Sequence, residues 1–144
     1  PYDAGSGRRV LLEGPPAPLA PRIAVPLGLA AHELATNAAK YGALSTPEGT
    51  VRVSWGVTSD GSVNHLEIVW KETGGPAVTP PTRKGFGSRL LLQGLARDLD
   101  GETRLDFAAD GVSCRMRLPL GEATTRPVVL LDQRRDRPAI AASL

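Results

Sequence analysis

The stretch from residue 26 to residue 42, PLGLAAHELATNAAKYG, most constrains how this chain can fold. Its spacing predicts an amphipathic helix at about 100° per residue. The apolar face is expected to carry Leu27, Ala31, Leu34, Ala35 and Ala38. The other face carries Glu33, Thr36, Asn37 and Lys40, with His32 and Tyr41 at its flanks. A carboxylate, a carboxamide and an ammonium in one stripe indicate a surface that holds a ligand.

Two residues are expected to mark the ends of this helix. Pro26 lacks a backbone N–H and fits the first turn of a helix better than its interior, so it is expected to mark the first regular turn. Gly42 is expected to end the helix in a left-handed cap, a conformation that glycine adopts without steric cost.

Alternating apolar residues predict strands in other parts of the chain. Residues 50–57 alternate with period two, and with residues 65–70 they predict an antiparallel pair. One face of its first strand carries Val51, Val53, Trp55 and Val57. A short strand is expected over residues 8–13, and a hairpin over residues 102–118 that Pro119 closes.

A second helix is expected over residues 88–98, with an apolar stripe of Leu91, Leu92, Leu95 and Leu99. Residues 71–87 before it are rich in Gly and Pro and are expected to form a long loop, a kind of segment that is often functional. The chain order is strand, helix, two strands, loop, helix and two strands. It predicts an α+β fold, a two-layer α/β sandwich with helices on one face of a mixed, mostly antiparallel sheet.

Composition excludes several classes of protein. A formal net charge of +2 over 144 residues does not favour a nucleic acid partner or a membrane surface, and no apolar run approaches the ~20 residues of a membrane span. The single cysteine, Cys114, excludes an internal disulfide and fits a cytoplasmic protein. Because the chain begins without Met, we expect a fragment, with one domain over residues 1–121 and a linker or tail over residues 122–144.

Glycines precede the second predicted helix in the run Gly85-Phe86-Gly87-Ser88. Backbone N–H groups at such a helix start accommodate a phosphate, and Arg83, Lys84 and Arg89 add positive charge. Taken alone, the run is equally compatible with a plain Gly-rich turn. It is neither a P-loop, since no G-K-[ST] follows, nor a dinucleotide fingerprint, since Leu90 stands at the third glycine position.

Three motifs in this order resemble the Bergerat-type ATP-binding fold of sensor histidine kinases and gyrase-like ATPases. More narrowly, they resemble the HWE subfamily of bacterial histidine kinases. The N box is HELATNAAKYGALS, which contains His32, and the first glycine box is WKETGGP, which contains Trp70 and Glu72. The glycine run described above is the second glycine box. The resemblance extends over about residues 2–120.

The resemblance implies roles for the polar face of the first predicted helix. Asn37 would coordinate the Mg²⁺ that bridges the ATP phosphates, an ion that takes few protein oxygens. Glu33 would be the candidate base or support the water shell of the metal. Lys40 would contact phosphate, and Tyr41 would lie along the adenine or ribose. His32 is either a nucleotide contact or a structural hydrogen-bond partner, and the phosphoacceptor His of this family lies on a separate upstream helix.

The glycine boxes would form the other walls of the same site. Glu72 takes the place of the Asp that holds the adenine amino group in ordinary members of the fold, and Gly74 would let the backbone approach the base. The second glycine box, at the end of a short lid over residues 77–84, would supply the cofactor-binding residues Lys84, Gly85, Gly87 and Ser88.

The resemblance therefore implies the ATP-binding catalytic domain of a two-component sensor histidine kinase. Such a domain uses ATP and Mg²⁺ and transfers the γ-phosphate to a His on a separate dimerisation domain of the same protein, which then acts on a response regulator. The alternatives are a gyrase-like ATPase, with Glu33 as the base for water, and a degenerate module that only binds nucleotide or a partner. Packing in the strand core is the favoured role for Trp70, and His65 is expected to be exposed.

Overall fold

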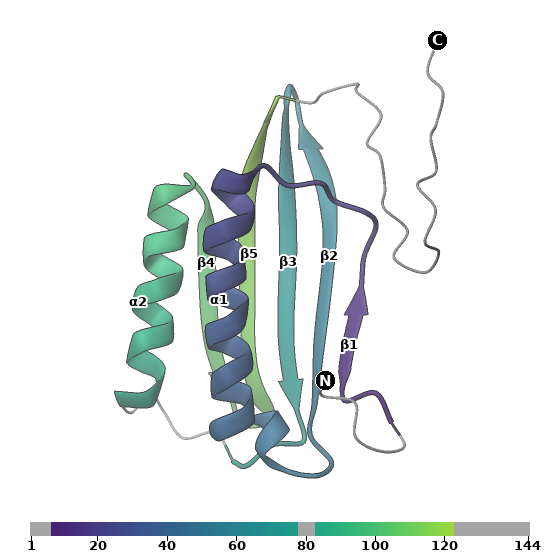
Figure 1. Ribbon diagram of the computed structural model, residues 1–144, viewed down its shortest axis with the longest axis vertical. Helices are drawn as coiled ribbons and strands as arrows, with labels where there is room; N and C mark the ends of the chain where they lie inside the picture. Colours follow the sequence, from purple (N-terminus) through teal and green to yellow (C-terminus); the bar gives the residue numbers. More distant parts are fainter. Residues whose placement is uncertain (1–6, 78–82, 123–144) are drawn as a thin grey trace.

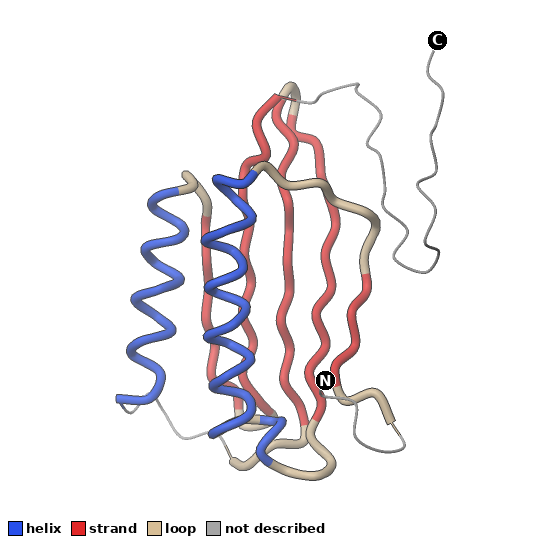
Figure 2. The backbone as a smooth tube through the Cα atoms, in the orientation of Figure 1, coloured by secondary structure: helices blue, strands red, loops and turns tan. Residues whose placement is uncertain are grey.

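The chain folds into two layers, a sheet and two long helices that lie side by side on one of its faces (Figure 1). This computed structural model describes residues 7–77 and 83–122. The elements in chain order are β1 (Val10–Glu13), α1 (Pro21–Lys40), the short 3-10 helix η1 (Ala43–Ser45), β2 (Thr50–Asp60), β3 (Val63–Thr73), α2 (Arg83–Asp98), β4 (Glu102–Ala108) and β5 (Gly111–Glu122). Figure 2 shows both long helices in front of the strands, which confirms the predicted α+β sandwich. None of the described helices is long and apolar enough to cross a membrane.

The five strands form one mixed sheet in the order β1-β2-β3-β5-β4. β1 runs parallel to β2, and all other neighbouring strands are antiparallel, so the predicted pair (β2 and β3) and the predicted hairpin (β4 and β5) are both present. The register places Val53 opposite Trp70 and Trp70 opposite Cys114. At the centre of the sheet, the face turned toward the helices is therefore covered by buried apolar side chains that form one core.

Helix α1 begins five residues earlier than predicted, because Pro21 and not Pro26 stands at its start. The extra turn carries Ile23 into the core, where it is 1% exposed, and such burial stabilises by roughly 1.5–3 kcal/mol. Pro26 lies inside the helix, where its missing N–H deprives only the carbonyl of Arg22 of an intrahelical partner. Arg22 is exposed, so water can reach that carbonyl.

The predicted left-handed cap at Gly42 is wrong. Gly42 has φ −108° and ψ −149°, and the helix ends at Lys40 with the N–H of Tyr41 donating to the carbonyl of Asn37 at 2.8 Å. The apolar face also differs from the prediction: Ala31 and Ala35 are exposed. The buried residues of α1 are Ile23, Ala30, Leu34 and Ala38.

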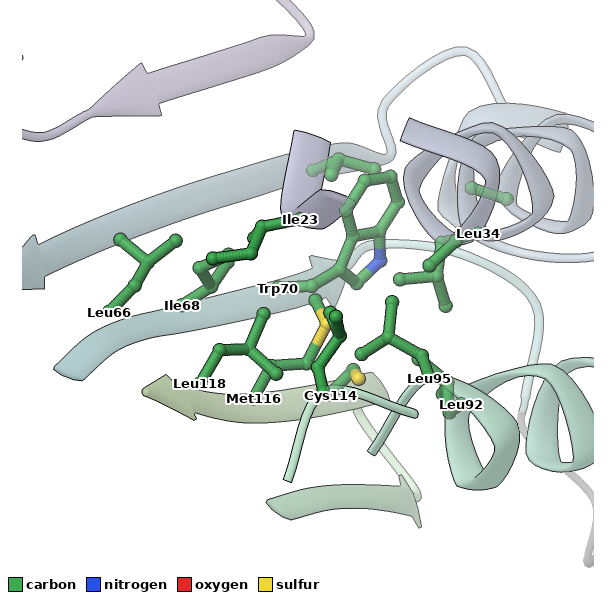
Figure 3. Close-up of a cluster of buried hydrophobic side chains, with 14 of the residues drawn as sticks. Ile23, Leu34, Leu66, Ile68, Trp70, Leu92, Leu95, Cys114, Met116 and Leu118 are labelled. Carbon is green, nitrogen blue, oxygen red and sulfur yellow. The ribbon is translucent and has the colours of Figure 1, made fainter. Parts of the chain in front are cut away.

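The core lies between the two helices and the central strands (Figure 3). Leu34 of α1 and Leu92 and Leu95 of α2 are buried against β3 and β5. Trp70 of β3 is 6% exposed, which confirms its predicted packing role, and Figure 3 shows its indole pointing toward Leu34. The predicted leucine stripe of α2 is therefore also confirmed as a core face.

Helix α2 likewise begins earlier than predicted, at Arg83, so Gly85 and Gly87 lie in its first turns instead of a preceding loop. Glycine disfavours a helix by about 1 kcal/mol against alanine, and the packing of the adjoining stripe, which begins at the buried Ser88, offsets that cost. β3 continues to Thr73, which shortens the predicted loop of residues 71–87 at its other end. Of the predicted lid over residues 77–84, residues 78–82 lie outside the described part of the chain.

β5 also runs further than predicted, through Pro119 to Glu122. At Pro119 only β3 pairs with β5, because the β4 ladder covers residues 111–117, and such an edge tolerates a residue without N–H. His65 pairs with Pro119 across an irregularity in the ladder and is half-buried, so the prediction that it is exposed is wrong. Of the predicted tail, residues 123–144 lie outside the described part of the chain.

Candidate functional site

The three sequence motifs come together at one end of the molecule, the lower end in Figure 1. Helices α1 and α2 are antiparallel neighbours, so the last turns of α1 lie beside the first turns of α2. β3 ends at the same level, and η1 follows α1 there. The fold thus brings residues 33–43, 72–75 and 83–88 into one region.

A hydrogen bond joins the two helices inside this region. The side-chain Nδ2 of Asn37 on α1 donates to Oγ of Ser88 on α2. Ser88 is 3% exposed and stands on the same face of α2 as Leu92 and Leu95. Because Nδ2 is used in this bond, the Oδ1 of Asn37 remains as the acceptor oxygen, and no described residue donates to it.

Glu33 lies one helical turn before Asn37 and is half-buried. An added Cβ on Gly87 of the neighbouring helix would lie 3.9 Å from the Oε1 of Glu33. The helix pair therefore brings together four of the predicted site residues: Glu33, Asn37, Gly87 and Ser88.

The other predicted residues of α1 lie closer to solvent. His32 and Lys40 are exposed, and both alternatives for His32 stay predictions. Tyr41, at the C-cap of α1, is 48% exposed. The phosphate contact of Lys40 and the base or ribose contact of Tyr41 stay predictions.

Glu72, near the end of β3, forms a third side of the region and is 4% exposed. Its Oε2 accepts a hydrogen bond from the indole Nε1 of Trp70 at 3.0 Å, and its Oε1 accepts one from the backbone N–H of Ala43 at 3.0 Å. Sequence reasoning placed Trp70 and Glu72 in one box but missed both bonds. The period-two alternation of β3 was the only available signal, since residues two apart in a strand share a face.

Close backbone approaches surround η1 and the loop that follows it. Gly74 has φ +77°, and a Cβ there would lie 3.1 Å from the Cα of Gly49. An added Cβ on Gly75 would lie 2.8 Å from the backbone N of Ala43. Gly74 was predicted to let the backbone approach a nucleotide base, and what it approaches in this structure is the loop after η1. Its contact with the base stays a prediction.

Arg9 holds the same loop from the side of β1, and sequence reasoning missed it. Its guanidinium donates to the carbonyls of Gly49 (3.0 Å) and Ala43 (3.3 Å) and to that of Thr46. No spacing rule connects an arginine before a strand with a loop some forty residues later, so the sequence carried no signal for it.

Besides the side chain of Ser88, the second glycine box offers the backbone groups of its glycines. Gly85 lies in the first turn of α2, where N–H groups have no intrahelical acceptor, and such N–H groups together with the helix dipole favour an anion. The side chain of Lys84 lies outside the described part, so its predicted role is untested.

Two side chains of α1 carry oxygen atoms that fit a magnesium ion as ligands. Among the described residues no group of three or more His, Cys, Asp and Glu side chains could hold a metal by itself. Mg²⁺ does not require such a group, since it is usually bound through one or two protein oxygens together with phosphates and water. The carboxylate of Glu33 and the Oδ1 of Asn37 are oxygen donors of the required kind, one turn apart on one helix.

A separate hollow of about 540 Å³ lies on the sheet, across β5 and its neighbours β3 and β4. Charged residues such as Glu67, Arg104 and Arg115 line it, and none of the motif residues does. The chemistry of the motifs places the candidate site at the helix ends instead.

Comparison with known proteins relates the chain to histidine kinases in sequence. No family model matches it. It is 42% identical over 120 residues to a protein of Brucella anthropi named blue-light-activated histidine kinase, which covers 83% of this chain and 24% of that protein. A protein of the same name from Brucella ovis is 38% identical over 120 residues. The chain therefore spans about a quarter of the length of these curated relatives.

Solved structures share the fold. A blue-light-activated histidine kinase of Erythrobacter litoralis superposes with a TM-score of 0.63 at 20% identity, covering 81% of this chain and 36% of that one. The catalytic domain of the histidine kinase ThkA superposes with a TM-score of 0.53 at 14% identity, covering 79% of this chain and 80% of that one.

Proposed function

Because this chain is a relative of histidine kinases and has the fold of their catalytic domains, we propose that it binds Mg-ATP and presents the γ-phosphate for transfer to a histidine. Within that family, the His32, Trp70 and Glu72 positions support assignment to the HWE group. The acceptor His would stand on a dimerisation domain of the longer protein, in a two-component pathway that ends at a response regulator. A domain that uses ATP in such a pathway works in the cytoplasm.

The observation that carries this proposal is the arrangement of Glu33, Asn37 and Ser88 where α1 meets the start of α2. Phosphoryl transfer depends mostly on positioning and on neutralising charge. Ser88 fixes the carboxamide of Asn37, so that Oδ1 is oriented without the entropy cost of a freely rotating side chain. When bound, Mg²⁺ supplies positive charge at the phosphate oxygens, and Asn37 would hold it.

The remaining residues would act either on the attacking group or on the phosphates. Glu33, half-buried and one turn from Asn37, would accept a proton from an attacking group or orient water, as the candidate base. The N–H groups in the first turn of α2 would bind phosphate oxygens, and Lys40 would add a positive charge at the end of α1.

Substitution of Asn37 tests the proposal. Titration of the chain with a fluorescent ATP analogue should show binding that Mg²⁺ strengthens. Asn37→Ala should remove the Mg²⁺-dependent part and weaken binding by about tenfold or more, since each tenfold corresponds to about 1.4 kcal/mol. Asn64→Ala, at the other end of β3, is the matched control and should leave the affinity unchanged. The absence of wild-type binding at high micromolar nucleotide would refute the proposed function, and unchanged affinity in Asn37→Ala would refute the metal assignment.

A further inference from the structure

The carboxylate of Glu72 is buried without a cation. It is 4% exposed, and no arginine or lysine forms an ion pair with it in the described part of the chain. A buried carboxylate is costly unless its oxygens are hydrogen-bonded. Two hydrogen bonds offset that cost, one to each oxygen. Their donors are the indole N–H of Trp70 and the backbone N–H of Ala43.

A third contact fixes the position of the same carboxylate. An added Cβ on Gly42 would overlap the Oε1 of Glu72, so the carboxylate occupies the space that any side chain at position 42 would need. Glu72 is thus held by the indole of Trp70, by the N–H of Ala43 and by the bare backbone of Gly42.

The indole that holds Glu72 is itself immobilised by the core. Trp70 is 6% exposed, and Figure 3 shows its ring among Leu34 of α1 and the core residues of β5. The other tryptophan serves as a contrast: the Nε1 of Trp55 donates at 2.7 Å to the carbonyl of Pro15, a residue outside the three motifs. Of the two indole N–H groups, only that of Trp70, whose ring is packed in the core, bonds to a carboxylate.

We propose that Trp70 is a positioning residue, which orients the carboxylate of Glu72 so that the site selects adenine over guanine. This inference rests on the proposed nucleotide site. Each carboxylate oxygen has about two acceptor positions, so each keeps one after the bonds to Trp70 and Ala43. A fixed acceptor accepts from the exocyclic amino group of adenine. Guanine presents a carbonyl oxygen at the same ring position, which a carboxylate that cannot turn away repels.

Trp70→Phe tests this role, because it removes the N–H donor and keeps an aromatic ring in the core, although the smaller ring leaves part of the indole volume empty. Competition against a fluorescent ATP analogue in Mg²⁺ would give the Kd of ATP, GTP and tripolyphosphate. The ratio of the GTP to the ATP constant should fall at least tenfold in Trp70→Phe, whereas the tripolyphosphate constant should not change. Trp55→Phe is the matched control and should leave all three constants as in the wild type, since its indole bonds only to Pro15.

A second variant covers the case in which Trp70→Phe does not fold. Gly42→Ala pushes the carboxylate of Glu72 from the opposite side and should also lower the GTP to ATP ratio. Its control is Gly28→Ala on α1, where an added Cβ meets no atom within 4 Å. Thermal unfolding of each variant would show that the fold is retained.

The outcomes separate the two proposals. A wild-type chain that binds neither ATP nor tripolyphosphate overturns the proposed function. A wild-type chain that binds both nucleotides equally, or a folded Trp70→Phe variant that keeps the full preference for ATP, overturns the positioning role alone. An equal loss of affinity for all three ligands in Trp70→Phe would show a general structural defect and would also overturn it.

Discussion

Cys114 is the only cysteine of the chain, and its side chain is fully buried in β5 opposite Trp70. Burial raises the pKa of its thiol from 9.0 to about 12, and the negative charge of Asp106 adds to the shift. In the unfolded chain the thiol would ionise near its ordinary value, whereas in the folded chain it stays protonated. The unfolded state therefore loses its proton first as the pH rises, and the folded state loses stability.

This difference predicts an alkaline loss of stability that belongs to one residue. The free energy of unfolding of the wild type, minus that of Cys114→Ala, should be constant below about pH 8. Above pH 9 it should fall with a slope that approaches about 1.4 kcal/mol per pH unit, because each unit of pKa difference carries that free energy. Urea denaturation of both proteins between pH 7 and pH 10 measures it. A difference that does not change over this range would contradict the assigned pKa.

Single residues show where the sequence was sufficient and where it was not. The packing of Trp70 and the burial of Leu34 could be predicted, because alternation and helical spacing report which face a residue occupies. The bonds from Trp70 and Ala43 to Glu72 could not, since they depend on the loop between α1 and β2 returning to the end of β3. Spacing describes one element at a time and carries no information about such a return.

Several parts of the candidate site depend on the segment of residues 43–49, which begins with η1. Ala43 at its start bonds to Glu72 through its N–H and to Arg9 through its carbonyl. The guanidinium of Arg9 also bonds to Thr46 and Gly49, so one side chain ties the loop to the edge of the sheet. The conformation of this loop is therefore coupled to the segment that leads into β1.

Removal of this side chain should loosen the loop. Arg9→Ala removes one donor from each of three carbonyls, of which that of Ala43 still accepts from Thr46. It should lower the free energy of unfolding by about 1–3 kcal/mol, the usual cost of part-buried polar groups that lose a partner. Urea denaturation measures the loss, and amide hydrogen exchange should become faster in residues 43–49. Arg8→Ala, at the exposed neighbouring residue, is the control and should change stability by less than about 0.5 kcal/mol. Equal effects of the two substitutions would disprove the role of Arg9.

The ends of the elements were the least predictable feature at this scale. Pro26 and Gly42 both carry strong local signals for a helix boundary, and both were overridden. The burial of Ile23 extends α1 at its start, and the carboxylate of Glu72 explains why position 42 is a glycine without any left-handed turn. In both places a contact with a distant part of the chain decided what the local sequence left open.

At the scale of the whole molecule, the order of the elements was enough to predict the fold. Alternating strands that pair with short turns gave the antiparallel ladders, and two amphipathic helices could bury their apolar faces only against the sheet. Charged residues on the other face of the sheet agree with this, for example the exposed pair of Glu67 and Arg117 at 3.3 Å. Such pairs contribute at most about 1 kcal/mol, so they mark a face turned to water and do not hold the fold together.

The whole-molecule proposal makes a last prediction about turnover. If the chain is a kinase catalytic domain, its γ-phosphate acceptor lies on another domain, and Mg-ATP alone should give no sustained release of phosphate. If it is instead a gyrase-like ATPase, Glu33 activates water, and release should continue over many turnovers and stop in Glu33→Gln. A phosphate-release assay on the wild type and Glu33→Gln distinguishes the two, with fluorescent-analogue binding to both proteins as the control that the site is intact. Sustained, Glu33-dependent release would overturn the kinase proposal while leaving the nucleotide site in place, because the binding measurement tests that site separately.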